Sequence, residues 1–170
     1  MTEEKTFKAA TVVFPLRGDN VLLARKTRKI GAGCWNGYGG VPDPGETLPA
    51  CAVRELFEES GLSARPEDLT KVAIMDFHNT KSDGTTFIAR VHFFTLAVWE
   101  GVCRATDEMA DPTWFVQDCL PLEEMMPADR VYLPLVFSGK KIVGTAHYTP
   151  FQQALIGEVT LSEVADFPET

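Results

Sequence analysis

Two pairs of apolar runs each flank a short polar turn, and both pairs predict β-hairpins. Residues 11–16 (TVVFPL) and 21–24 (VLLA) enclose the turn at 18–20 (GDN). Residues 69–78 and 85–99, rich in Thr, Val, Phe and Ile, enclose a second turn at 81–84 (KSDG). β-Branched and aromatic side chains favour strands, whereas Gly, Asn and Asp favour tight turns. We therefore expect strands in both parts of the chain.

The segment between the hairpins predicts a binding loop followed by a helix. Residues 27–45 are rich in glycine and also contain Trp35 and Tyr38, a mixture typical of a shaped loop. Over residues 47–60 the apolar residues return every four positions, as on one stripe of a helix. Thr47 can cap the first turn of this helix, and Gly61 can end it.

Weaker patterns follow the second hairpin. Residues 113–116 and 141–147 are strand candidates, and residues 127–138 predict a second helix in spite of Pro134. Apolar residues alternate again over 155–161, and the end of the chain, 163–170, is expected to fray. Strands on both sides of a central helix, with a second helix behind them, predict a mixed sheet covered by helices on two faces. The expected fold is one α/β domain over residues 1–170.

Charge and composition narrow the possible partners. Lys and Arg total 16 and Asp and Glu total 24, so the formal net charge is -8, which opposes tight binding to long nucleic acid. The chain has no apolar run of membrane-spanning length and no apolar signal segment at its start, which predicts a cytoplasmic protein without a membrane partner. The four cysteines form no C-x-x-C pair and lie at no zinc-ligand spacing, so we expect buried free thiols.

Three glutamates on the predicted helix point to metal chemistry. At 100° per residue, Glu55, Glu58 and Glu59 fall within one arc of about 100°. Like charges at these spacings repel each other, and Arg54 can relieve Glu58 but cannot neutralise all three. An all-oxygen ligand set selects a hard divalent cation such as Mg²⁺, which commonly also binds substrate phosphates. The site therefore predicts a polyphosphate substrate.

The alternative interpretation of three helical glutamates is a solvated surface. The preceding segment argues against it, because Gly39 and Gly40 permit close backbone approach and the turn at 42–45 (PDPG) brings Glu46 back toward the helix.

The whole segment resembles the signature box of the Nudix hydrolase superfamily. Residues 40–62 read GVPDPGETLPACAVRELFEESGL and match the box at every fixed position. The resemblance implies a Nudix-type α/β/α sandwich with a mixed central sheet. It also implies that a divalent cation, Mg²⁺ with Mn²⁺ as a substitute, binds a set of oxygen ligands consisting of Glu55, Glu58, Glu59, Glu108 and the carbonyl of Gly40.

The same resemblance assigns supporting and catalytic roles. Arg54 would orient the glutamates, pairing with Glu55, and Glu46 would brace the loop. The general base differs between family members, and Glu59 and Glu108 are the two candidates here.

A second motif indicates which class of nucleotide is the substrate. Residues 31–40 (GAGCWNGYGG) are similar to a run in the MutT-type oxidised-purine nucleoside triphosphatases of the same superfamily. By this resemblance Asn36 reads the edge of a purine, Thr11 and Lys26 line the nucleoside pocket, and Met109 packs on the base. The alternatives are a turn-forming Asn36 and ordinary hairpin roles for Thr11 and Lys26.

Three positions depart from the relatives' pattern. Met126 stands where they have Trp, Ala128 and Asp129 stand where they have two aspartates, and Ile30 replaces an aromatic residue. Met126 and Asp129 remain substrate-binding candidates, but base stacking on an aromatic ring is worth roughly 1–3 kcal/mol. We therefore expect weaker selectivity for oxidised bases than in those relatives.

The sequence predicts a Mg²⁺-dependent pyrophosphohydrolase that cleaves purine nucleoside triphosphates, oxidised ones in particular, to nucleoside monophosphate and pyrophosphate. One alternative is hydrolysis of another nucleoside diphosphate derivative, such as a dinucleoside polyphosphate, a nucleotide sugar or a capped RNA. Another is a non-catalytic ligand sensor, although such proteins usually lose the box glutamates and this chain keeps them. The expected partner is a small nucleotide, with the chain acting as a monomer or homodimer.

Overall fold

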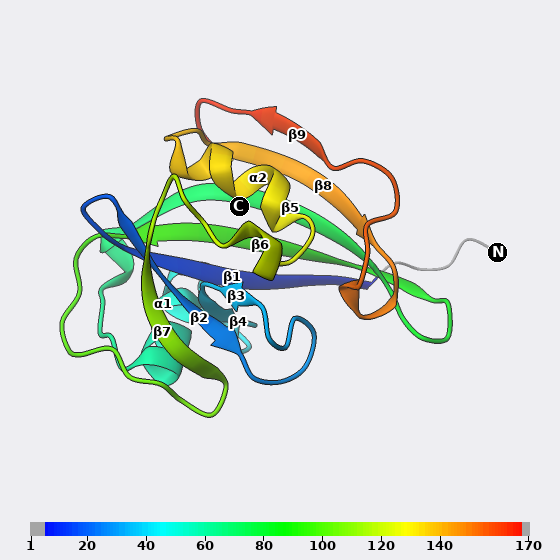
Figure 1. Ribbon diagram of the computed structural model, residues 1–170. Coiled ribbons are helices and arrows are strands. Elements are labelled where there is room, and N and C mark those ends of the chain that lie inside the picture. Colours follow the sequence, from blue (N-terminus) through cyan, green and yellow to red (C-terminus); the bar gives the residue numbers. More distant parts are fainter. Residues whose placement is uncertain (1–5, 168–170) are drawn as a thin grey trace.

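The computed structural model describes residues 6–167, which form a mixed nine-stranded sheet with an α-helix on each face (Figure 1). The strands are β1 (Thr6–Arg17), β2 (Asn20–Lys26), β3 (Trp35–Asn36), β4 (Tyr38–Gly40), β5 (Leu69–Thr80), β6 (Thr86–Leu96), β7 (Met109–Val116), β8 (Ile142–Tyr148) and β9 (Thr160–Glu163). The helices are α1 (Leu48–Ser60) and α2 (Asp129–Phe137), with short 3-10 turns η1 (Pro66–Asp68), η2 (Leu122–Glu124) and η3 (Pro150–Gln152).

The sheet combines parallel and antiparallel pairs. Its main path runs β3-β2-β1-β6-β5-β8-β9, while β4 pairs with β1 and β7 pairs with β2. The β1–β6 and β5–β8 pairs are parallel, and the other pairs are antiparallel. α1 lies in the connection from β4 to β5, so the helix follows directly on a strand that pairs with the centre of the sheet.

The central strands are apolar on both faces because each face packs on a different helix. Val13 belongs to the core cluster that contains Leu56 of α1, whereas its neighbour Phe14 belongs to the cluster that contains Leu133 of α2. Successive side chains of a strand point to opposite faces, so adjacent residues serve different cores. This arrangement confirms the predicted α/β/α sandwich.

Most predicted elements are present, and the differences lie where strands are short or pairing is long-range. Both hairpins and both helices are confirmed. The structure adds β3 and β4 inside the segment predicted as a loop, since two or three residues are too few to show an alternating pattern. β7 begins at Met109, four residues before its predicted start, and the last strand, β9, lies later than the predicted alternation over 155–161.

The end of the chain is held further than expected. Glu163 belongs to β9, the N–H of Val164 donates to the carbonyl of Lys141 (2.9 Å), and Asp166 lies 3.7 Å from the Lys141 ammonium. The remainder of the segment expected to fray, 168–170, lies outside the described residues.

The four cysteines are free, as predicted, but only Cys51 is buried. The expectation of a buried thiol is wrong for Cys119, which is exposed in the turn that follows β7. Within residues 6–167, no helix has both the length and the apolar character needed to cross a membrane.

Candidate functional site

The glutamates are positioned by a helix with well-defined ends. The Thr47 hydroxyl accepts a hydrogen bond from the N–H of Ala50 (3.2 Å), which satisfies one of the free donors of the first turn. At the other end Gly61 has φ 81°, and its N–H donates to the carbonyl of Phe57 (2.9 Å). These two caps fix α1 and with it the spacing of Glu55, Glu58 and Glu59.

A close approach between β4 and α1 explains why position 40 is glycine. A β-carbon built on Gly40 would lie 2.4 Å from the carboxylate carbon of Glu55. A side chain at position 40 would therefore push the Glu55 carboxylate away, whereas glycine lets it lie against this strand. The Gly40 carbonyl and the Glu55 carboxylate are thus brought to the same place from elements that follow each other in sequence.

Arg54 binds the carboxylates of three glutamates, Glu46, Glu55 and Glu58. Its Nε and Nη2 donate to the two carboxylate oxygens of Glu46 (2.8 Å each), and its Nη1 donates to Glu55 (3.0 Å) and Glu58 (3.3 Å). The bidentate pair lowers the pKa of Glu46 to about 2, and Glu46 also accepts the N–H of Asp43 (3.0 Å). Arg54 and Glu46 therefore have the contacts expected of residues that orient the glutamates and brace the loop.

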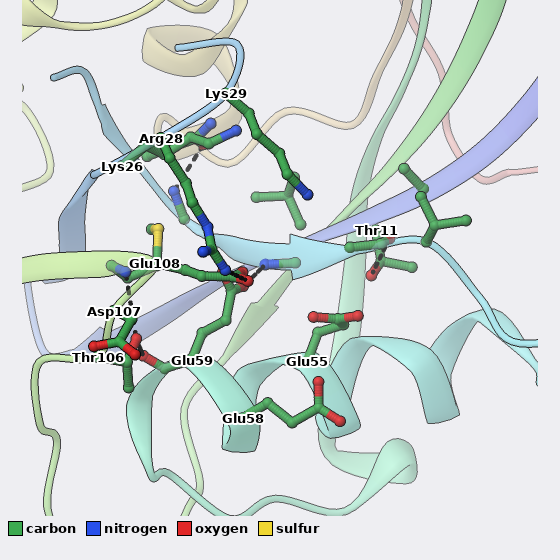
Figure 2. Close-up of a pocket in the computed structure, with 18 of the residues that line it drawn as sticks. Thr11, Lys26, Arg28, Lys29, Glu55, Glu58, Glu59, Thr106, Asp107 and Glu108 are labelled. Carbon is green, nitrogen blue, oxygen red and sulfur yellow. Dashed lines mark hydrogen bonds and ion pairs between the residues drawn. The ribbon is translucent and has the colours of Figure 1, made fainter. Parts of the chain in front are cut away.

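Glu59 is the most enclosed of the three helical glutamates. It is 8% exposed, and its carboxylate accepts the N–H of Gly39 (2.9 Å). Burial, assisted by the charges of Glu55 and Glu108, raises the pKa of Glu59 to about 7 against the lowering effect of the Gly39 hydrogen bond. Figure 2 shows Glu59 directed from α1 toward Glu108 on the opposite wall.

Glu108 comes from the segment before β7 and is held by the loop that follows β2. Its carboxylate pairs with Arg28, and its carbonyl accepts the N–H of Thr27 (3.1 Å). Lys26, at the end of β2, is partly buried, and burial lowers the pKa of its ammonium. A tertiary contact thus adds Glu108 to the acids of α1.

The predicted metal ligands share one cleft but face separate partners. Among residues 6–167, no three acidic, His or Cys side chains converge closely enough to hold a metal ion. The reason is local: Glu58 faces Arg54, Glu59 faces Gly39, and Glu108 faces Arg28. The donor set itself, carboxylates and a backbone carbonyl, suits a hard divalent cation, and the like charges favour one. The metal site remains a prediction.

The cleft joins these acids to most of the predicted substrate residues. It has a volume of about 960 Å³, and Thr11, Lys26, Asn36 and Met109 line it together with Gly40 and the four glutamates. Figure 2 shows Thr11, Lys26 and the glutamates around this space. Asn36 accepts the N–H of Gly37 through Oδ1 (2.8 Å). Acids and nucleoside-binding candidates therefore face one continuous space.

Met126 and Asp129 do not line this cleft. The sulfur of Met126 packs against Gly31, in the loop that follows β2, and lies 3.2 Å from where a β-carbon of Gly31 would be. Asp129, at the start of α2, is 5% exposed and accepts a hydrogen bond from the Tyr132 hydroxyl (2.6 Å). Burial raises the pKa of the Asp129 carboxyl to about 6. Their roles in substrate binding remain predictions.

Several residues that line the cleft were not predicted from the sequence. Arg28 and Lys29 follow β2, and Arg104 and Thr106 lie in the connection before β7. The basic pair directly before the glycine-rich run is a signal that could have indicated the first two. Arg104 and Thr106 have no motif, since only the packing of their segment on α1 brings them to the cleft, through bonds such as Thr106 Oγ1 to the carbonyl of Glu59 (2.9 Å).

Comparison with known proteins finds a family model and relatives that match most of the chain. Residues 6–136 match the family model described as "NUDIX domain". The chain is 38% identical over 162 residues to the "Oxidized purine nucleoside triphosphate hydrolase" of Danio rerio and 37% identical over 162 residues to that of Mus musculus. The alignments cover 95% of this chain in both cases and 98% and 99% of the relatives.

A solved structure supports the fold. The MutT protein of Bacillus halodurans superimposes with a TM-score of 0.74 over 91% of this chain and 97% of its own, at 24% identity. Because the family model matches residues 6–136 and two relatives align over nearly their full length, this chain belongs to the Nudix hydrolase family.

Proposed function

We propose that this protein is a Mg²⁺-dependent pyrophosphohydrolase that converts purine nucleoside triphosphates, above all oxidised ones, to nucleoside monophosphate and pyrophosphate. The observation that carries the proposal is the continuous cleft of about 960 Å³, which exposes the box glutamates and Asn36 to the same space. A nucleoside triphosphate requires both, because the base and the phosphates must be held at once. The two relatives that align over nearly their full length bear the name of this activity.

Nudix hydrolases use divalent cations, and the oxygen donors here suit Mg²⁺ with Mn²⁺ as a substitute. A bound cation would supply positive charge to the phosphates and lower the pKa of the attacking water. The proposed ligands of this cation are Glu55, Glu58, Glu59, Glu108 and the Gly40 carbonyl. Arg54 would orient Glu55 and Glu58 through the hydrogen bonds that it donates to them.

Asn36 is proposed to bind the base by donating a hydrogen bond to it. Because Oδ1 already accepts the N–H of Gly37, the side-chain NH₂ of Asn36 is the group that can face a ligand. An NH₂ group suits the O6 acceptor, which guanine and its 8-oxo form share. Met109, which is buried against the cleft, would pack on the ring.

Glu59 and Glu108 remain the two candidates for the general base. Glu59 is enclosed and bound to Gly39, whereas Glu108 is half-exposed and paired with Arg28. Only a kinetic comparison of the two separates them.

The test is a substrate panel with purified protein and Mg²⁺. Oxidised and normal purine triphosphates, a dinucleoside polyphosphate, a nucleotide sugar and a capped RNA are compared, with pyrophosphate and orthophosphate measured separately. We expect pyrophosphate and monophosphate from the oxidised purine triphosphates. Orthophosphate as the main product, or turnover of another class alone, would overturn the proposal, and no turnover at all would favour the sensor interpretation.

A variant tests the base contact. Asn36→Ala should raise KM roughly tenfold or more, the scale of a lost hydrogen bond of about 1–3 kcal/mol, and leave kcat nearly unchanged. An unchanged KM would mean that Asn36 only shapes the turn beside Gly37.

A further inference from the structure

The charges that line the cleft pose a problem for a polyphosphate ligand. Five acids face it, namely Glu55, Glu58, Glu59, Asp107 and Glu108. A polyphosphate carries several negative charges, so it enters only where cationic groups offset these acids. The side-chain cations on the cleft wall are Lys26, Arg28, Lys29 and Arg104.

The loop that carries Arg28 and Lys29 is fixed against the opposite wall. Thr27 donates to it twice, through its N–H to the carbonyl of Glu108 (3.1 Å) and through its hydroxyl to the carbonyl of Asp107. Both bonds use backbone carbonyls, so they leave the Glu108 carboxylate free to pair with Arg28. The loop would thus keep its place even if that ion pair opened.

Lys29 occupies a conformation that its residue type disfavours. Its φ is 64°, in the left-handed region where glycine is favoured and a β-carbon is crowded. Within residues 6–167 its ammonium makes no hydrogen bond or ion pair, and Figure 2 shows the side chain extending from the loop into the cleft. The fold gains no internal contact from this ammonium. Strained residues of this kind gather at ligand sites.

We propose that Arg28 and Lys29 form a clamp for the polyphosphate of the substrate, in which Arg28 releases the Glu108 carboxylate and binds a phosphate oxygen instead. Lys29 offers a second cation that no acid within the described chain neutralises. The exchange leaves the Glu108 carboxylate free to face the cleft. This inference rests on the proposed function, since it concerns the phosphate portion of the same substrate.

The clamp is tested by calorimetric binding of inorganic tripolyphosphate and of orthophosphate in Mg²⁺ buffer. Lys29→Gln and Arg28→Gln should each weaken tripolyphosphate binding about tenfold and change orthophosphate binding less than twofold. Lys81→Gln, which removes an exposed lysine outside the cleft, is the matched control and should change neither. Tripolyphosphate affinity equal to that of the control, or an equal loss for both anions, would overturn the clamp.

Lys29→Gly separates binding from folding. It removes the ammonium and also the strain at φ 64°, so it should raise Tm while weakening tripolyphosphate binding as much as Lys29→Gln does. A Lys29→Gly variant that keeps wild-type affinity shows that Lys29 holds no phosphate.

The exchange at Arg28 is tested by a double-variant cycle in EDTA buffer. Glu108→Gln should strengthen tripolyphosphate binding, and most of this gain should vanish when Arg28→Gln is already present. Equal gains in both backgrounds would show that Glu108 only repels the anion and that no exchange takes place. None of these assays contains a nucleotide, so the clamp and the proposed hydrolysis can fail independently.

Discussion

The buried carboxyl of Asp129 should make the stability of the protein depend on pH in a direction unusual for an acidic residue. Among residues 6–167, the Tyr132 hydroxyl donates one hydrogen bond to this carboxyl and the charge of Arg130 favours its ionised form, yet burial outweighs both and raises its pKa from 3.8 to about 6. A carboxyl with a raised folded-state pKa binds its proton more tightly in the folded protein than in the unfolded chain. Its destabilising effect is therefore absent below about pH 4, grows as the pH rises, and is complete above about pH 6.

The magnitude follows from the size of the pKa rise. A change from 3.8 to about 6 corresponds to about 3 kcal/mol, of which roughly 2.5 kcal/mol develops between pH 4 and pH 7. Asp129→Asn cannot ionise, yet its amide oxygen can still accept the Tyr132 hydroxyl. The variant should therefore gain about 2.5 kcal/mol relative to the wild type over this interval, whatever its pH-independent difference.

Urea unfolding at intervals from pH 4 to pH 8 measures this gain, because other titrating groups contribute equally to both proteins. Asp118→Asn, which makes the same exchange at an exposed aspartate, is the matched control against which the gain is read. A stability difference between Asp129→Asn and the wild type that does not change with pH would refute the reasoning, since the Asp129 carboxyl would then titrate alike in both states.

The same variant decides what Asp129 does. If Asp129 reads the purine edge, Asp129→Asn should raise KM for purine triphosphates while it stabilises the fold, a known conflict between function and stability. Greater stability with an unchanged KM would make Asp129 a structural residue and would remove it from the substrate-binding set.

Three further predictions concern the divalent cation, the general base and the close approach at Gly40. EDTA should abolish pyrophosphate release without changing the far-ultraviolet circular dichroism, because the apolar core, and not a cation, holds the fold; activity that persists in EDTA contradicts this. Glu59→Gln should lower kcat about a hundredfold or more, and a comparable loss in Glu108→Gln but not in Glu59→Gln would move the general base to Glu108. Gly40→Ala should lower kcat at least tenfold, because its methyl group would displace the Glu55 carboxylate from a position 2.4 Å away; wild-type kcat would show that this close approach is dispensable.

Features that depend on neighbours along the chain could be predicted from the amino-acid sequence. The period of apolar residues and the caps Thr47 and Gly61 defined α1, and covalent spacing alone placed Glu55, Glu58 and Glu59 on one face of it. These features are local because a helix repeats every 3.6 residues and its caps bond within one turn.

Contacts across the cleft and the burial of single side chains could not be predicted in this way, because they depend on how the elements pack. Arg28 and Glu108 are 80 positions apart and form their ion pair because the loop after β2 packs on the segment before β7. The burial of Asp129 likewise follows from the docking of α2 on the sheet. Ion pairing and desolvation depend on distances through space, and in a mixed sheet those distances are set by strand pairing between residues far apart in sequence.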